Sequence, residues 1–301
     1  MDSRSVLRVI AILVWSAVAL TTVTHTVSAR HSLRFSSNRD EPIASCSDLH
    51  VNFENRRAIF QSEERTISKA EASTLRIQAE SNGGLQVEGW DSDNYSVTLC
   101  KAADPDDNPE ALLSKIHLTF QNGELSVSGP SSSHDRWTAH LLIKSPRAAS
   151  LDLQVNNGPL GLFHVDGELR VRAQNGPITV NACTANLDLT AKNGPVTLEG
   201  NSGKLRVDAQ NGPVTISLKG TTWSGSGIEA HANNGPLTLR IPSGYQSGVL
   251  VESDGNSPFH CHVSVCSEGR KTWEDNRKSI EFGSGPTMIH LSTVNGPISI
   301  D

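Results

Sequence analysis

The sequence is poor in aromatic residues and has no block of like charge. Aromatic side chains make up 5 per cent of the 301 residues, whereas there are 24 glycines and 14 prolines. This composition favours many short strands and tight turns around a narrow interior over a wide, aromatic-rich core. The formal net charge is −6 and the charged residues are scattered, so the basic footprint of a nucleic-acid-binding protein is missing. We therefore expect no nucleic-acid partner.

Long hydrophobic runs are missing after the first thirty residues. Arg4 and Arg8 precede an apolar run that ends in small residues at Ala29. The run has about fifteen residues, fewer than the roughly twenty that span a bilayer. We therefore predict a signal peptide at 1–29, a flexible lead-in at 30–45 and export to the periplasm or cell surface, with no integral membrane span after signal removal. A retained N-terminal anchor is the alternative.

Cysteine is scarce, and its count is odd. The five cysteines are Cys46, Cys100, Cys183, Cys261 and Cys266, so at least one is unpaired or pairs between chains. Export permits disulfides, but the sequence does not determine the pairing. "IASC" before Cys46 resembles a lipidation box, but it lies far from the apolar run, so lipidation is not favoured.

The stretch "HCHVSVC", residues 260–266, contains side chains of the kinds that bind zinc or copper. On a strand, His260 and His262 point to one face and Cys261 to the other, which does not close a four-ligand site. A disulfide or buried thiols are favoured, and we expect no metal and no cofactor.

The most abundant pattern is a repeat of Asn-Gly-Pro. The first four copies recur at every eighteenth position, and two more follow at wider spacing. The repeated residues are Asn157, Gly158, Pro159, Asn175, Gly176, Pro177, Asn193, Gly194, Pro195, Asn211, Gly212, Pro213, Asn234, Gly235, Pro236, Asn295, Gly296 and Pro297. Apolar residues occupy alternate positions on both sides of each copy, so each unit predicts two short strands with one buried face.

The proline decides between a hairpin and a solenoid corner. Asn-Gly alone is a strong hairpin signal, but the residue after glycine must then donate its N–H across the turn, and proline has none. A corner between successive strands of a coil fits better, because the proline fixes φ on entry to the next strand. Stacked coils would then align the Asn side chains, whose amides can bond from coil to coil. The Asn-Gly-Pro residues are therefore predicted to form a structural turn ladder.

We predict an all-β fold: a single elongated β-solenoid of stacked, two-strand repeats of about 18 residues. Residues 46–150 form divergent N-terminal β coils with one short helix near 109–115, where Asn108 can cap and Pro109 suits the first turn. Residues 151–301 form the regular coils. The segment around Asn122-Gly123, with Glu124 in place of proline, is predicted to be a further coil. "GTTWSGSG" and "CSEGRKTWEDNRKS" are expected to be loops.

No catalytic constellation stands out. The outward column five residues before each repeat Asn alternates in sign and contains Asp152, Arg170, Asp188, Arg206, Glu229 and His290. Such a wall favours a ladder of ion pairs over the clustered carboxylates of a polysaccharide lyase or hydrolase. We therefore assign no catalytic residue, and a glycan-active enzyme is the alternative.

Two further features have weaker functional readings. A threonine column (Thr179, Thr197, Thr215, Thr238) is more typical of strand formation than of ice binding. Trp223 and Trp273 are expected to be exposed and are possible ligand contacts, although covering the core is the commoner role for such a tryptophan.

The repeated Asn-Gly-Pro, the segment "GTTWSGSGIEAHANNGPLTLRIPSGY" and the closing "GSGPTMIHLSTVNGPISI" resemble the bacterial family named putative adhesin, of unknown function and related to toast-rack envelope domains. The resemblance covers roughly residues 75–301. It implies a β-solenoid-like, exported, non-catalytic binding or scaffold module of the cell envelope, whose partner is an unknown envelope glycan or protein.

Overall fold

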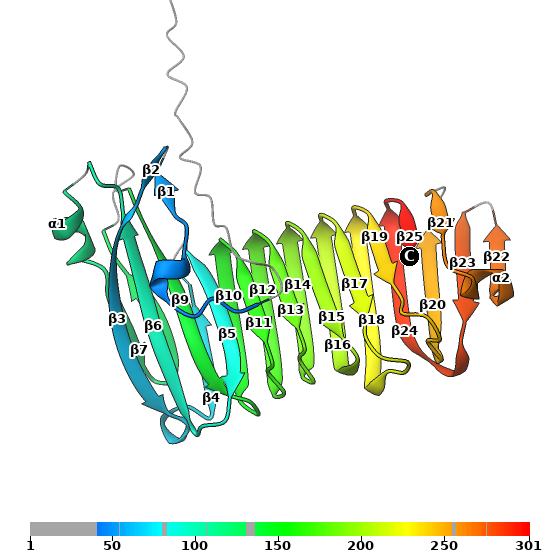
Figure 1. The fold of residues 1–301 in the computed structure, drawn as a ribbon, viewed down its shortest axis with the longest axis horizontal. Helices are drawn as coiled ribbons and strands as arrows, with labels where there is room; N and C mark the ends of the chain where they lie inside the picture. Colours follow the sequence, from blue (N-terminus) through cyan, green and yellow to red (C-terminus); the bar gives the residue numbers. More distant parts are fainter. Residues whose placement is uncertain are drawn as a thin grey trace, which may run out of the picture. The chain divides into compact units, whose positions relative to one another are not determined.

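The computed structural model describes residues 41–301, apart from 54, 80–82, 107, 131–135, 255–256 and 275. The described residues belong to a unit that spans Ser32–Asp301, so the expected signal peptide and most of the lead-in lie outside them. This unit contains two long sheets, a small two-stranded sheet and two short α-helices (Figure 1). The predicted all-β solenoid is confirmed. No helix within the described ranges is long and apolar enough to cross a bilayer.

The first sheet has twelve strands, in the order β22 (Arg270–Glu274), β23 (Arg277–Phe282), β20 (Ser247–Asp254), β24 (Ser284–Asn295), β18 (Ser224–Asn234), β16 (Ser202–Asn211), β14 (Asn186–Asn193), β12 (Glu168–Asn175), β10 (Ser150–Asn157), β4 (Thr74–Gln78), β8 (Glu124–Ser128) and β7 (His117–Gln121). The second has eleven, in the order β21 (Phe259–Cys261), β25 (Ile298–Ile300), β19 (Leu237–Arg240), β17 (Val214–Leu218), β15 (Val196–Gly200), β13 (Ile178–Asn181), β11 (Leu160–Phe163), β5 (Gly84–Trp90), β9 (Trp137–Pro146), β6 (Asn94–Ala103) and β3 (Ile59–Ser68).

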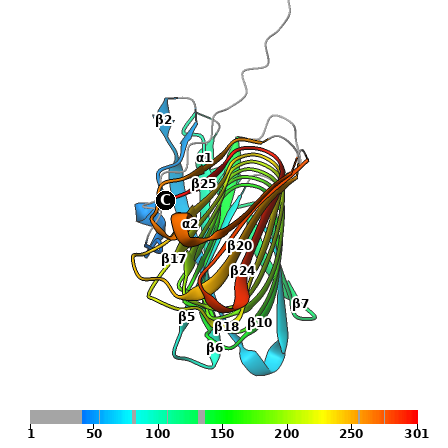
Figure 2. The ribbon, with the colours of Figure 1, turned by 90° about the vertical axis from the view of Figure 1, so that its right-hand side faces the viewer.

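In the regular coils, each turn of the chain contributes one strand to each sheet. Successive coils pair in parallel and in the register of the sequence repeat, so Thr179 lies opposite Thr197 and Leu187 opposite Leu205. The end view in Figure 2 shows these coils superposed around a common interior. The period-2 pattern explains the packing: in β14, Leu187, Leu189 and Ala191 are buried while the residues between them are exposed. A coil buries its apolar face only against its neighbours, so the stack folds as one.

The N-terminal region departs from the predicted coils. β3 pairs antiparallel with β6, and β6 pairs antiparallel with β9. The expectation of a further coil around Asn122-Gly123 is wrong, because β7 and β8 form an antiparallel hairpin there. Both turn residues have positive φ, 52° and 74°, as a tight hairpin requires. With Glu124 in place of proline, nothing prevents this turn.

A short segment covers the outer side of the second sheet. The Gln86 side chain makes two hydrogen bonds to the backbone of Ile43: Oε1 accepts from the N–H at 2.8 Å and Nε2 donates to the carbonyl at 2.9 Å. Cys46 forms a disulfide with Cys100 of β6. Leu49, Val51 and Phe53 pack in a small second apolar cluster that includes Leu142. This segment includes the short strand β1 (Asn52–Phe53), which pairs with β2 (Arg56–Arg57). Ile43, within the lead-in expected to be flexible, is therefore tied down in this arrangement.

The two helices are short. α1 (Pro109–Leu113) lies where the sequence predicts a helix, with Leu112 and Leu113 buried. The side chain of Asn108 makes no cap hydrogen bond, so its expected capping role is wrong; its carbonyl oxygen instead accepts from the Leu112 N–H at 3.1 Å. α2 (Val265–Glu268) was not expected from the sequence.

The C-terminal end breaks the order of the chain. β24 inserts between β18 and β20 and pairs in parallel with both. The expected loop at 266–279 contains the end of α2, strand β22 and the start of β23, so that expectation is wrong. The sequence order thus fails at this end because the last repeat returns to the open edge of β18.

Candidate functional site

The Asn-Gly-Pro corners form a continuous ladder along one edge of the regular coils. The Nδ2 atom of each Asn from 175 onwards donates to Oδ1 of the Asn in the neighbouring coil, at 2.7–3.1 Å. The backbone hydrogen bonds run the opposite way, to the following coil, since Gly176 N–H donates to the Asn193 carbonyl and Ile178 N–H to the Pro195 carbonyl. These donors and acceptors bond one coil to the next. The ladder therefore stabilises the stacking of the coils, and its amides are already used in these bonds.

The charged wall lies on the outer face of the twelve-stranded sheet. Asp152, Arg170 and Asp188 are direct partners in successive strands, as are Asp188, Arg206 and Glu229. The ion pair of Asp152 runs diagonally to Arg172 at 2.9 Å, and Arg206 lies 4.0 Å from Glu229. Exposed pairs of this kind contribute little stability. The alternating wall therefore keeps the outer surface polar and close to neutral along the stack.

Two adjoining grooves lie at the other corner of the coils, where the strands of the twelve-stranded sheet begin. The corner groove has a volume of about 380 Å³ and the wall groove about 370 Å³. Both are lined by Ser150, Glu168 and Asn186, which occupy equivalent positions in three successive coils. Lys204, in the next coil, continues this column in the corner groove. We call Ser150, Glu168, Asn186 and Lys204 the groove column.

Small residues make the corner groove possible. Gly167, Ala185 and Gly203 line it at equivalent positions of consecutive coils. A Cβ atom at Gly167 would overlap the Ala149 carbonyl oxygen, so a larger residue is excluded there. The polar side chains pair across coils, because Asn186 Nδ2 donates to Glu168 Oε2 at 2.8 Å and the Thr184 hydroxyl donates to Asp166. The groove thus presents carboxylate, amide, hydroxyl and ammonium groups, one coil after another.

The sequence reasoning missed the groove column, although the repeat contains its signal. Its members lie seven residues before each repeat Asn, just as the charged wall lies five residues before it. The constant spacing of the repeat places such a column on one line. Only the structure shows that small residues at the corner leave space beside it.

The two tryptophans have opposite environments. Trp223 is only 6 per cent exposed, and its indole N–H donates to the Gly203 carbonyl at 3.0 Å. Its expected exposure is therefore wrong, because the ring packs on the core. Trp273, in β22, is 53 per cent exposed and contacts Phe259 with ring centroids 5.7 Å apart. Lys278 Nζ lies 5.9 Å from the Trp273 ring centroid. Of the two rings, only that of Trp273 is thus open to a partner.

A disulfide lies within residues 260–266. Cys261 and Cys266 form this bond, and the ring of His260 in β21 stacks on that of His262, just beyond the strand, with centroids 6.4 Å apart. Cys183 is a free, buried thiol whose pKa is raised to about 11 by burial. Across the described ranges, no group of three His, Cys, Asp or Glu side chains is placed to hold a metal.

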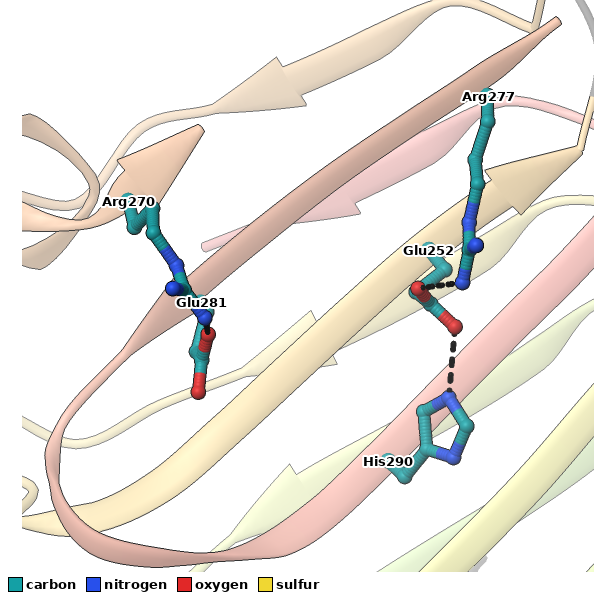
Figure 3. Close-up of polar contacts among 5 residues, drawn as sticks. All are labelled: Glu252, Arg270, Arg277, Glu281 and His290. Carbon is teal, nitrogen blue, oxygen red and sulfur yellow. Dashed lines mark hydrogen bonds and ion pairs between the residues drawn. The ribbon is translucent and has the colours of Figure 1, made fainter. Parts of the chain in front are cut away.

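A polar cluster near the C-terminal end centres on Glu252 (Figure 3). Its carboxylate accepts from His290 Nε2 at 3.0 Å and from the Arg277 guanidinium, while Arg270 pairs with Glu281 on the neighbouring strands. Burial alone would raise the pKa of Glu252, but the hydrogen bonds from His290 and Arg277 lower it overall. The cluster is a paired network and leaves Glu252 without the raised pKa of a general acid.

No protein-family model matches the chain, and no curated protein matches it. Among solved structures, the chain is similar to a putative cell adhesion protein from Clostridium sporogenes, at 14% identity over 80% of this chain and 99% of that one, with a TM-score of 0.35. It is similar to a putative adhesin from Bacteroides fragilis at 10% identity, over 80% and 96% of the two chains, with a TM-score of 0.33. A putative lipid binding protein from Parabacteroides distasonis has 10% identity, over 80% and 96%, with a TM-score of 0.27.

Proteins named adhesins are thus among the solved structures that this chain is similar to, as the resemblance in the sequence implies. Similarities this low say nothing of a ligand, so function is argued from this chain's own residues.

Proposed function

We propose that this chain is an exported, non-catalytic module of the bacterial envelope that binds an extended, hydroxyl-rich polymer, a glycan, in the two adjoining grooves. The groove column carries the proposal. Its four side chains come from four successive coils, so they repeat at about 4.8 Å, the spacing of adjacent strands. A polymer lying along the stack would meet one polar side chain per coil.

The chemistry of the lining favours a sugar over an apolar ligand. Carboxylate and amide oxygens accept hydrogen bonds from hydroxyl groups, and the Asn186 amide and Lys204 ammonium donate them. The small residues at Gly167, Ala185 and Gly203 allow a bulky ring to approach the backbone. Among the described residues that line the two grooves, none is aromatic.

The disulfides support export. Cys46–Cys100 and Cys261–Cys266 lie at opposite ends of the coils, and such bonds persist in oxidising compartments outside the cytoplasm. The predicted signal peptide at 1–29 fits the same location. On this proposal, the protein resides where its glycan does, in the periplasm or on the cell surface.

The alternative is a glycan-active enzyme, because Asp152, Glu168 and Asp188 line the wall groove. Hydrolysis needs one carboxylic acid to donate a proton and a second carboxylate to act as base or nucleophile. Asp152 is paired with Arg172, and Glu168 accepts from Asn186. These partners hold both groups as hydrogen-bonded acceptors, which favours binding over proton transfer.

The test is affinity electrophoresis of the purified protein through gels that contain neutral or anionic envelope polysaccharides. At least one polysaccharide should retard the protein, and Asn186→Ala together with Lys204→Ala should remove the retardation. Thr197→Ala with Thr215→Ala, on the other sheet, is the matched control and should migrate like the original. Equal retardation of both double variants would contradict the groove. Release of reducing ends or unsaturated products, lost in Asp188→Asn, would establish the enzyme instead.

A further inference from the structure

The twelve-stranded sheet ends in an open edge at β22. This strand, Arg-Lys-Thr-Trp-Glu, pairs with β23 on one side, and all five of its residues are exposed. It lies at the end of the row of strands in Figure 1. None of the described residues is hydrogen-bonded to its other side. An open edge presents unpaired backbone N–H and C=O groups, which bind another strand unless the edge is protected.

The sequence of β22 complements itself when two copies run antiparallel. If the pairing centres on Thr272, then Arg270 of one copy lies opposite Glu274 of the other, twice. Lys271 lies opposite Trp273 in the same arrangement, also twice. Directly opposite residues on paired strands share a face and lie about 4.5–5.5 Å apart, so both contacts are within reach. The first is an ion pair and the second a cation–π contact.

Within one copy, the charged side chains of β22 already lie beside side chains of opposite charge on β23. Arg270 and Glu281 are direct cross-strand partners, and so are Glu274 and Arg277. Arg270 pairs with Glu281 on the same face of the sheet that bears the Glu252 cluster (Figure 3). Across the junction, the charges would then alternate from Glu281 and Arg270 of one copy to Glu274 and Arg277 of the other. This continues the alternation of the charged wall.

Two of the other three edge strands, β7 and β21, lack this complementarity. The third, β3, carries Glu63, Glu64 and Arg65, but Glu63 is paired with Lys101 and Arg65 lies over the Phe120 ring. β7, at the far end of the same sheet, contains no Asp, Glu, Lys or Arg. β21, which ends the second sheet, is three residues long and is tied to α2 by the Cys261–Cys266 disulfide. Charged residues on an edge usually block pairing because like charges meet. On β22 they meet their opposites.

We propose that a second copy of this chain binds the open edge of β22. The two sheets then continue into one another through an antiparallel β22–β22 pair centred on Thr272, and a two-fold axis relates the copies. The geometry is isologous, so it closes at a dimer. This places the solenoids end to end and the two groove columns on one assembly, with no change to either groove.

Charge reversal tests this proposal. Arg270→Glu places Glu opposite Glu274 in the homodimer, and Glu274→Arg places Arg opposite Arg270, so each variant alone should be monomeric by light scattering. Mixing the two variants restores both ion pairs in the heterodimer, and the mass should double again. The original protein should be dimeric at the same concentration. Arg206→Glu, a change at another exposed arginine in the middle of the wall, is the control and should remain dimeric.

Cross-linking supplies a second measurement that does not depend on charge. Thr272→Cys places two thiols opposite each other on the two-fold axis, within the distance a disulfide needs. Mild oxidation should convert it to a covalent dimer, whereas Ser279→Cys, one strand further in, should stay monomeric under denaturation. Cys183 is buried and the other four cysteines are paired, so background coupling should be low. A monomeric original protein, failure of the mixture to dimerise, or equal cross-linking of both cysteine variants would overturn the proposal.

Discussion

The same dipeptide, Asn-Gly, makes two different turns in this chain. Between β7 and β8, Asn122 and Gly123 both have positive φ, and Gln121 lies directly opposite Glu124 in a two-residue hairpin. In the regular coils, Asn193 ends β14, only Gly194 has a positive φ, of 129°, and Pro195 leads the chain into the other sheet. The residue after glycine is what distinguishes them: Glu124 has an N–H to donate across a hairpin and Pro195 has none.

The two regions are also stabilised differently. Each regular coil pairs with the coils before and after it in the sequence and repeats one set of contacts. The N-terminal region joins strands more distant in sequence, through β3–β6–β9 pairing and the Cys46–Cys100 disulfide. The coils depend on close backbone stacking, whereas the N-terminal region depends on individual buried groups. Substitutions should therefore act by different mechanisms in the two regions.

The largest difference in lost stability is expected between alanine substitutions of two glycines, Gly194 in the coils and Gly123 in the hairpin. A Cβ atom at Gly194 would overlap the Gly176 carbonyl oxygen, which is backbone and cannot turn aside. At Gly123 the nearest atom would be 3.5 Å away. Gly194→Ala should therefore destabilise by about 3–5 kcal/mol through steric overlap and a left-handed conformation. Gly123→Ala should cost about 1–2 kcal/mol through the conformation alone.

Urea unfolding followed by circular dichroism measures this difference. Gly200→Ala is a suitable control, because nothing lies within 4 Å of its Cβ position and its φ is not positive. Equal losses at Gly194 and Gly123 would mean that close stacking of the corners adds nothing to the stability of the coils.

A second contrast is in acid sensitivity, and it depends on His140. This β9 residue is 4 per cent exposed and lies against Gly84 of β5, where a Cβ atom would overlap its imidazole ring. Burial lowers its pKa from 6.5 to about 4. His140 is therefore neutral in the folded protein and protonated in the unfolded chain below pH 6.5. Its contribution to stability is full above that pH and is lost as pH falls towards 4, by about 3 kcal/mol in total.

The measurement is the free energy of unfolding at pH 7.5 and pH 5 for the original protein and for His140→Gln. The substitution should shrink the difference between the two pH values, whatever it does to stability at either one. Thr197→Ala, a change in the coils that removes no titratable group, should leave that difference unchanged. If His140→Gln also leaves it unchanged, the ring does not titrate on unfolding as burial requires.

The sequence predicted the coils because they repeat. The constant period sets the register, and alternate apolar positions set the buried face, so β10 to β19 follow from pattern alone. It did not predict that β24 inserts between β18 and β20. Asn295 fits the ladder next to Asn234 whether or not another coil lies between them in sequence. Likewise, local sequence does not determine that the residues before β18 bring Trp223 back onto the core. The grooves could not be predicted either, because they depend on which corner of the coils the small residues occupy.

The smallest contrast, and the most direct test of what decides the turn, exchanges the residue after glycine. Glu124→Pro removes the N–H that the hairpin needs, so it should destabilise by about 1–3 kcal/mol. Pro195→Glu should cost less than about 1 kcal/mol, mostly by adding freedom to the unfolded chain. The Pro195 carbonyl, which accepts from Ile178 N–H at 2.9 Å, is retained by any residue at that position.

Hydrogen exchange in the Pro195→Glu variant distinguishes two roles that the proline could have. If proline only stiffens the corner, its loss is tolerated because Gly194 and the stacked backbone already hold the coil in place. If proline instead forbids a competing hairpin, Pro195→Glu would allow β14 to fold back on the following strand. Hydrogen exchange at Val196 and Leu198 would then rise well above that at Val214 and Ile216 in the next coil. Such a local rise, with global stability unchanged, would show that proline acts by excluding the turn that Asn122-Gly123 makes.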